Sequence, residues 1–223
     1  YRGYDSAGIA LHQTDQIAHL RTLGKVKLLE EKMIAEKPKS KLGIAHTRWA
    51  THGSPTENNA HPHSSKNDIY VVHNGIIENH QEIRNSLEKL GHKFLSQTDS
   101  ECISHLIENY LDNNDDIEKA IIKTANKIKG ANVVVIISSN HPEKIFCFRV
   151  GSAGGLIIAH GNNEMFLASD IAALVPLSDM ITFLEPGQTA QVSQSNVVIE
   201  NTDGELISTK PQKVFHNSSN VTK

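Results

Sequence analysis

Cysteine is scarce in this sequence, and its scarcity excludes two common ways of stabilising a fold. The 223 residues hold only Cys102 and Cys147, which lie far apart and form no Cys-x-x-Cys motif. Disulfide frameworks and zinc knuckles both need several closely spaced cysteines. We therefore expect both thiols to be buried structural side chains.

Long apolar runs and an excess of positive charge are also missing. No stretch approaches the roughly 20 apolar residues that a membrane-spanning helix needs. The net charge is −3 and the basic residues are scattered, so the sequence indicates no surface for nucleic acid or for an anionic membrane. We expect a soluble, cytoplasmic protein without a nucleic-acid or membrane partner.

Methionine is missing from the first position, where Tyr1 stands at the head of the segment Tyr-Arg-Gly-Tyr-Asp-Ser-Ala-Gly. No charged and apolar targeting segment can be recognised at this end. These features predict a fragment of a longer protein whose own start lies upstream of Tyr1.

Apolar spacing predicts four helices in the middle of the chain. The first includes residues 26–33 and ends at Pro38. The second follows a capping box at residues 79–82 and buries Ile83, Leu87 and Leu90. The third begins at Asp99 or Ser100, and the fourth covers about residues 117–128 behind two acidic residues that suit a helix N-terminus.

Strands are predicted on both sides of these helices. A loop of about twenty residues, which we expect to be functional because of its length, separates the strands at 42–46 and 69–73. Strands followed by helices and then by more strands indicate layered sheets with helices packed outside. Residues 208–223 carry few apolar side chains and are predicted to be a linker. The remaining strands are expected at 8–11, 17–21, 133–137, 144–150, 156–159, 165–168, 181–184, 189–192 and 197–199, with a short helix near 172–175.

Two of the predicted strands end in polar residues that suit ligand chemistry. The first runs into Arg48, whose planar guanidinium can bind a carboxylate through two hydrogen bonds. The second runs into Asn74 and Gly75, where a side-chain amide beside a backbone N–H suits a developing oxyanion. A nucleophile to accompany these groups is not evident in the sequence.

Histidine is plentiful, and His61 and His63 stand close enough to suggest a metal site. No third ligand follows them with clear spacing, so we expect these histidines to pack within a loop and no metal to bind. The glycine-rich residues 151–155 lack the Gly-x-Gly-x-x-Gly spacing and precede a strand, so they are predicted to form a turn and not a nucleotide loop.

Five ordered motifs give the chain a close resemblance to a known family. They are residues 1–8, 46–53, 59–63 and 73–79, and Thr98-Asp99 with Glu101. In this order they resemble the glutaminase domain of the glutamine–fructose-6-phosphate aminotransferases (isomerising), which are class II glutamine amidotransferases. The resemblance covers residues 1–207 and implies an α+β fold, the four-layer αββα sandwich of the N-terminal-nucleophile hydrolases. The turn at 151–155 departs from the family pattern.

The resemblance implies that Arg48 binds the α-carboxylate of L-glutamine and that Asp99 receives its α-ammonium group. Asp99 also stands where a helix begins, so a plain capping role is an alternative. For Arg48 the alternative is a surface arginine paired with a nearby acid.

The resemblance also implies an oxyanion hole made by Asn74 and Gly75, although Asn-Gly after a strand is often only a hairpin turn. Trp49 would belong to a mobile loop that gates ammonia, and a plain aromatic plug of the core is its alternative. Thr51 and His52 would help that loop to close over the substrate. Arg2 is expected in a supporting role near the nucleophile.

The mechanism that the resemblance implies needs a cysteine at the mature N-terminus, whose thiolate attacks glutamine and whose α-amine is the base. Tyr1 cannot do this, so the fragment is expected to be inactive alone. The intact enzyme would be a homo-oligomer without a cofactor that passes ammonia to fructose 6-phosphate in a separate isomerase domain. A class II amidotransferase with another acceptor, or a non-catalytic module that binds glutamine or glutamate, remain alternatives.

Overall fold

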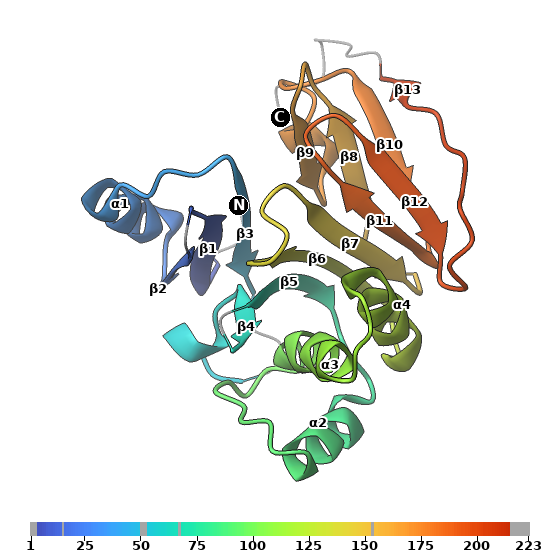
Figure 1. Ribbon diagram of the computed structural model, residues 1–223. Helices are drawn as coiled ribbons and strands as arrows, with labels where there is room; N and C mark the ends of the chain where they lie inside the picture. The colour runs from blue at the N-terminus through green and yellow to red at the C-terminus, as the bar shows by residue number, and fades with distance from the viewer. Residues whose placement is uncertain (1–3, 15, 50–52, 67, 153, 215–223) are drawn as a thin grey trace.

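Three antiparallel sheets and four α-helices make up the part of the chain that the computed structural model describes, residues 4–14, 16–49, 53–66, 68–152 and 154–214 (Figure 1). The helices are α1 (Val26–Glu36), α2 (His80–Lys89), α3 (Glu101–Asp112) and α4 (Ile117–Lys127), with short 3-10 turns at Glu57–Asn59 and Ile171–Ala173. The strands are β1 (Ser6–His12), β2 (Ile17–Leu23), β3 (Leu42–Arg48), β4 (His63–Ser65), β5 (Ile69–Gly75), β6 (Asn132–Ser138), β7 (Ile145–Val150), β8 (Leu156–His160), β9 (Met165–Ala168), β10 (Met180–Leu184), β11 (Gln188–Val192), β12 (Val197–Asn201) and β13 (Gln212–Lys213).

A six-stranded sheet in the order β12-β11-β7-β6-β5-β4 lies at the centre of the fold. Side chains alternate across a strand, so each strand of this sheet serves two cores. In β5, Ile69 and Val71 pack towards α2, α3 and α4, whereas Tyr70 and Val72 face the opposite way. The helices α2–α4 therefore cover one face of this sheet, as Figure 1 shows.

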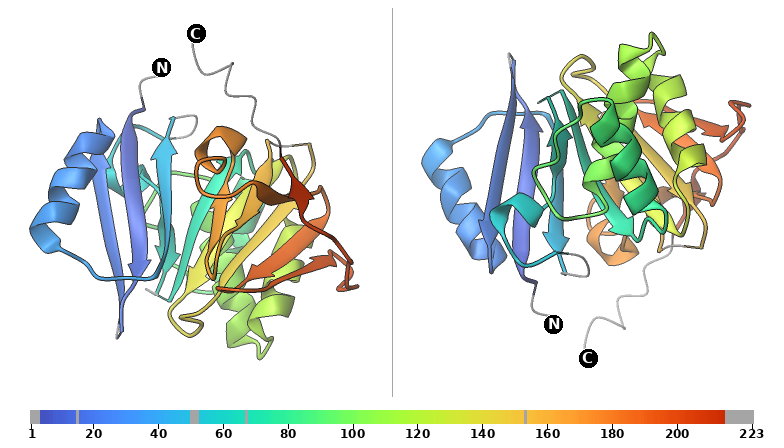
Figure 2. Two further views of the ribbon diagram at one scale, coloured as in Figure 1. Left: turned by 90° about the horizontal axis from the view of Figure 1, so that it is seen from above. Right: turned by 90° about the horizontal axis from the view of Figure 1, so that it is seen from below.

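Two smaller sheets cover the other face. Ala10 and Ile44 bring the sheet β2-β1-β3 against β5, and Leu156 and Ile158 bring the sheet β13-β10-β8-β9 against β6 and β7. Helix α1 packs on the outside of β1 and β2 through Leu29. The order of layers is helix, sheet, sheet, helix (Figure 2), which confirms the predicted α+β sandwich.

The structure extends several of the predicted elements and corrects others. The long loop before β5 is not structureless, because it contains a 3-10 turn and the strand β4, which pairs with β5. Strand β13 falls within the predicted linker and pairs with β10. No described helix combines the length and the apolar character that crossing a membrane requires.

The predicted capping box before α2 is wrong. Asn79 is the N-cap of α2, but its side chain makes no capping hydrogen bond. Its amide instead donates to the carbonyl oxygen of Lys127 and accepts from the N–H of Lys129, which ties α2 to the end of α4. Leu90, predicted to be buried, is 66% exposed just beyond the last turn of the helix.

Candidate active site

A cavity of about 490 Å³ opens where β3, β5, β9 and the segment before α3 meet. Five of the eight residues that the sequence predicts for the site line it: Arg48, Trp49, Asn74, Gly75 and Asp99. They come from three separate stretches of the chain, which the fold brings together at one edge of the two facing sheets. The other three, Arg2, Thr51 and His52, lie outside the described residues.

Arg48 ends β3 and is only 4% exposed, which excludes a surface arginine. Its guanidinium Nη2 donates to the carbonyl oxygen of Gly53 at 3.3 Å, and Nη1 lies 3.6 Å from Asp5 Oδ1. The backbone of Asp5 also donates to the carbonyl oxygen of Arg48 at 3.0 Å. These contacts hold a planar, charged donor group at the wall of the cavity, which suits a carboxylate ligand.

Asp99 is buried, and its carboxylate does not cap the helix that follows. Ser100 is the N-cap of α3, whereas Asp99 Oδ2 accepts the backbone N–H of Ile77 at 2.8 Å. Its Oδ1 lies 3.4 Å from the hydroxyl oxygen of Ser100. A carboxylate offers about four acceptor positions, so capacity remains for a ligand ammonium group.

The side-chain amide of Asn74 is oriented by an imidazole on the facing sheet. His46 Nε2 lies 2.8 Å from Asn74 Oδ1. Because an amide oxygen only accepts, Nε2 must carry the proton and donate it. This bond fixes Oδ1 towards His46 and leaves the two N–H groups of the amide as the donors that Asn74 offers.

Gly75 stands at the end of β5 in a backbone conformation that other residues rarely adopt, with φ of 139°. A Cβ atom at this position would lie 2.2 Å from the carbonyl oxygen of Ala131. Only glycine therefore allows β5 to approach the start of β6 this closely. The close approach fixes the backbone of Gly75 at the cavity wall.

Four imidazoles support these residues, and three of them, His46, His61 and His73, also line the cavity. His73 bonds Ser100 Oγ at 2.8 Å and Asn132 Oδ1 at 2.9 Å, which links β5, α3 and β6. The ring of His46 is tilted against that of His61, and the rings of His61 and His63 meet edge to face, with centroids 4.3 and 4.5 Å apart. Burial lowers the pKa of all four, that of His63 to about 3, so they act as neutral donors and acceptors near pH 7.

The sequence predicts that His61 and His63 pack within a loop, but no role for His46 or His73 follows from it. The missed signal is the period of two along a strand. This period places His46 on the same face of β3 as Arg48. His73 directly precedes Asn74 on β5, so the same period places it on the opposite face, where it meets Ser100, and the signal could have found His46 but not His73.

Trp49 is 56% exposed on the rim of the cavity, so it is not a plug of the core. Cys102 and Cys147 are both buried as predicted, and neither is among the residues that line the cavity. Burial raises the pKa of each thiol to about 12, which keeps both protonated near pH 7. Neither cysteine is thus a nucleophile for this cavity.

Comparison with known proteins gives consistent matches. The family described as "Glutamine amidotransferase domain" matches residues 46–176, more than half of the chain. A Haemophilus influenzae protein named glutamine–fructose-6-phosphate aminotransferase (isomerizing) is 46% identical over 221 residues, which are 98% of this chain and 35% of that protein. An Aquifex aeolicus protein of the same name is 44% identical over 93% of this chain and 35% of its own length. The chain spans about a third of the length of these curated relatives.

Solved structures with similar folds share less of the sequence. The glutamine phosphoribosylpyrophosphate amidotransferase of B. subtilis, complexed with ADP and GMP, matches with a TM-score of 0.74 and 21% identity over 92% of this chain and 44% of that chain. A glutamine aminotransferase class-II domain protein from Silicibacter pomeroyi matches with a TM-score of 0.63 and 15% identity over 89% of this chain and 91% of that chain. At these identities the likeness concerns the fold.

Proposed function

The chain belongs to the glutamine amidotransferase family, and from this premise we propose that it forms the glutamine-binding part of an enzyme that moves the amide nitrogen of L-glutamine to fructose 6-phosphate. One observation carries the proposal: Arg48, Asn74, Gly75 and Asp99 line the same cavity. The volume of about 490 Å³ lies within the range of small-molecule sites.

The two ends of glutamine would meet different groups. The guanidinium of Arg48 binds the α-carboxylate, because it presents a fork of donors and its position is fixed by Gly53 and Asp5. The carboxylate of Asp99 accepts the α-ammonium group with the capacity that Ile77 and Ser100 leave. Glutamine then extends its side chain along the cavity wall towards Asn74.

Asn74 and Gly75 would stabilise the oxyanion that forms on the amide carbon. His46 fixes the orientation of the Asn74 amide before the substrate arrives. The close contact with the start of β6 fixes the backbone N–H of Gly75 in the same way. Donors whose positions are fixed in advance stabilise a developing charge without reorganisation during the reaction.

The nucleophile is proposed to be an N-terminal cysteine outside these 223 residues, because both cysteines of the chain are buried with raised pKa values. Its thiolate attacks the amide carbon of glutamine, the C–N bond breaks, and ammonia leaves with a proton from the cysteine α-ammonium group. Water then hydrolyses the thioester and releases glutamate. Supporting roles remain predicted for Arg2, Thr51 and His52. Trp49, on the rim of the cavity, is predicted to act as a gate.

The rest of the proposal concerns the whole protein. Residues 1–207 would form the glutaminase domain, and 208–223 would lead to a sugar isomerase domain that holds fructose 6-phosphate. The relatives' name supports this acceptor. A homo-oligomer, a cytoplasmic location and a reaction without a cofactor are predicted.

The experiment that tests the proposal measures glutamate and glucosamine 6-phosphate produced by the full-length protein from L-glutamine and fructose 6-phosphate. Arg48→Ala should raise KM for glutamine about 10²-fold, because it removes one partner of a buried charged contact. Arg48→Lys is the matched control for charge, and it should recover only part of the affinity because it lacks the planar fork. An unchanged KM in both variants contradicts the role of Arg48.

Three other outcomes would contradict the wider proposal. Hydrolysis of glutamine without amino-sugar formation would indicate another acceptor. Saturable glutamine binding without hydrolysis would indicate a non-catalytic module. N-terminal sequencing of the protein from its natural source should find a mature cysteine, and a mature start at Tyr1 would rule out the proposed nucleophile.

A further inference from the structure

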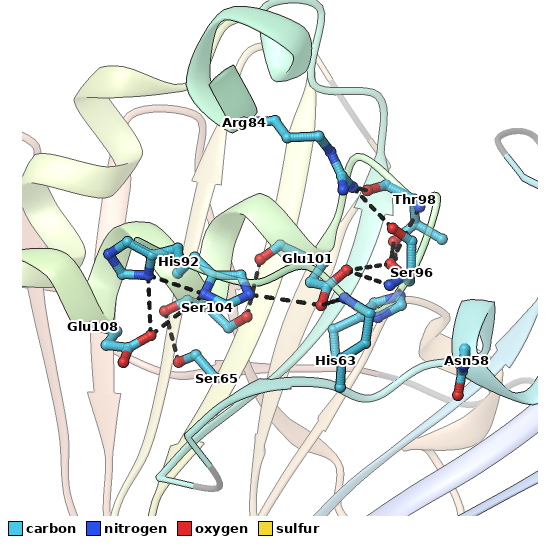
Figure 3. Close-up of polar contacts among 12 residues, drawn as sticks. Asn58, His63, Ser65, Arg84, His92, Ser96, Thr98, Glu101, Ser104 and Glu108 are labelled. Carbon is cyan, nitrogen blue, oxygen red and sulfur yellow. Dashed lines mark hydrogen bonds and ion pairs between the residues drawn. The ribbon is translucent and has the colours of Figure 1, made fainter. Parts of the chain in front are cut away.

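A second polar cluster lies apart from the glutamine cavity, where the loop after α2 crosses α3. His92 of this loop meets His105 and Glu108, which stand one turn apart on α3. The Nδ1 atoms of the two imidazoles are 3.1 Å apart, and each lies 3.3 Å from Glu108 Oε2. Figure 3 shows His92 and Glu108 directed towards one another at one end of this network.

All three side chains are withdrawn from solvent. The exposed fractions of the side chains of His92, His105 and Glu108 are 9, 6 and 7%. A cavity of about 290 Å³ adjoins them and is bordered by Gly91 and Lys66. The cluster is therefore a buried set of ligand-type atoms with an adjoining space, and not an exposed group of charges.

With both imidazoles neutral, hydrogen bonds alone cannot satisfy all three atoms at the centre of this cluster. His105 Nε2 faces the carboxylate of Glu101 at 3.6 Å, which favours the proton on Nε2 and leaves a lone pair on Nδ1. A proton on His92 Nδ1 can then serve His105 Nδ1 or Glu108 Oε2. The remaining two acceptors face each other at 3.3 Å with no hydrogen between them. A cation at the centre satisfies all three atoms at once.

We propose that His92, His105 and Glu108 bind one divalent transition-metal ion, and that Zn²⁺ is the ion whose chemistry fits them. Zinc takes imidazole nitrogen and carboxylate oxygen at about 2.0–2.2 Å in tetrahedral geometry, so neighbouring ligand atoms lie about 3.3 Å apart. The three observed separations of 3.1, 3.3 and 3.3 Å match the edges of such a tetrahedron. The fourth position of the ion faces the adjoining cavity.

The surroundings orient these ligands as partners of metal ligands usually do. Lys66 Nζ holds Glu108 Oε1 at 2.6 Å, which leaves Oε2 for the ion. Asp112 pairs with Lys66 at 3.0 Å, and Glu101 stands behind His105. The carboxylates of Glu101, Glu108 and Asp112 outnumber the two ammonium groups nearby, those of Lys66 and of Lys93 at the cavity, and the net negative charge favours a cation.

The ion would fasten the loop after α2 to α3. Beyond His92 the same loop donates the N–H groups of Leu95 and Ser96 to Glu101 at 2.8 and 2.7 Å. It then continues to Asp99 in the glutamine cavity. The site is therefore a structural support for the segment that carries Asp99, and it takes no direct part in the chemistry.

The test uses the full-length protein without an affinity tag, stripped of metal by a chelator and titrated with Zn²⁺ against a chromophoric competitor. Wild type should bind one more equivalent of Zn²⁺ than His92→Gln. His141→Gln makes the same change at a histidine outside the cluster and should keep the wild-type stoichiometry. Equal stoichiometry in all three proteins would overturn the proposal.

Three further readouts keep the test decisive if His92→Gln folds poorly. Co²⁺ bound to wild type should give the intense visible absorption of a tetrahedral ion, and Zn²⁺ should raise the melting temperature of wild type. X-ray absorption at the zinc edge should find two imidazoles and oxygen around the ion. A sulfur shell, or a pale octahedral cobalt spectrum, would show that the ion binds elsewhere and would overturn the assignment.

Discussion

The imidazole of His46 donates a 2.8 Å hydrogen bond to the side-chain amide of Asn74, across the space between β3 and β5. The two strands belong to different sheets, so this bond is a direct polar link between the two central layers. Because this bond occupies the amide oxygen, Asn74 can offer only its N–H groups to a ligand in the cavity.

Asn74→Ala in the full-length protein should lower kcat for glutamine hydrolysis while KM changes little. Loss of one oxyanion donor typically lowers turnover by about 10²–10³-fold, because the donor acts mainly on the charged intermediate. Steady-state kinetics with a glutamate assay gives both constants. A rise in KM equal to the loss in kcat would mean that Asn74 binds the ground state, contrary to the oxyanion role.

His46→Leu should have a smaller effect of the same kind, because it removes the orienting bond and keeps the donor. A hydrogen bond contributes about 0.5–1.5 kcal/mol net, which corresponds to about a 2- to 13-fold fall in kcat. The double variant with Asn74→Ala distinguishes a positioning role from a general structural one. The two effects should be far from additive, and additive losses would mean that His46 acts independently of Asn74.

Gly75→Ala should destabilise the protein strongly, because the new Cβ would collide with the carbonyl oxygen of Ala131 at 2.2 Å. Gly91→Ala is a matched control, since Gly91 also has a positive φ of 94° but open space around it. The control should cost only the backbone strain of about 1–3 kcal/mol. Urea unfolding measures both, and equal free energies for the two variants would contradict the proposed close approach of β5 and β6.

Unfolding should show a pH dependence that comes from His19. Burial, together with the charge of Arg21, lowers the pKa of His19 to about 4, and a bond to the carbonyl oxygen of Pro62 offsets this only in part. Between pH 6.5 and 4 the imidazole of His19 is protonated in the unfolded chain but stays neutral in the folded chain. The part of the free energy of unfolding that depends on neutral His19 is therefore fully present above pH 6.5 and is lost as the pH falls towards 4.

The size of that loss is about 1–3 kcal/mol, given the depth of the shift and the partial exposure of the ring. Urea unfolding of wild type and His19→Gln at pH 7, 5.5 and 4 measures it. The stability of wild type relative to the variant should fall across this series. Parallel curves would show that His19 titrates alike in the folded and unfolded chain.

The sequence was sufficient to predict the layers of the fold and the existence of β3 and β5, because alternation and apolar spacing mark those strands, although each strand ends two residues later than predicted. It failed where distant residues decide the outcome. Asn79 has the spacing of a capping box, yet its side chain bonds to the far end of α4. Strand β4 is too short for periodicity to reveal, and only its pairing with β5 defines it.

The candidate site follows the same division. Arg48 and Asn74 could be proposed from local chemistry, whereas Asp99 required the family resemblance because a third segment brings it to the cavity. For metal binding the sequence drew attention to His61 and His63, which are neighbours in the chain. The His92 cluster depends on where a loop crosses α3, and local spacing carries no sign of that crossing.

The measurement that tests the central claim most directly is a crystal structure of the full-length protein with L-glutamate, the expected product. The account predicts the α-carboxylate on Arg48, the α-ammonium group on Asp99, and the side-chain carboxylate beside Asn74 and Gly75. Glutamate bound in the opposite direction, or bound away from this cavity, would contradict it.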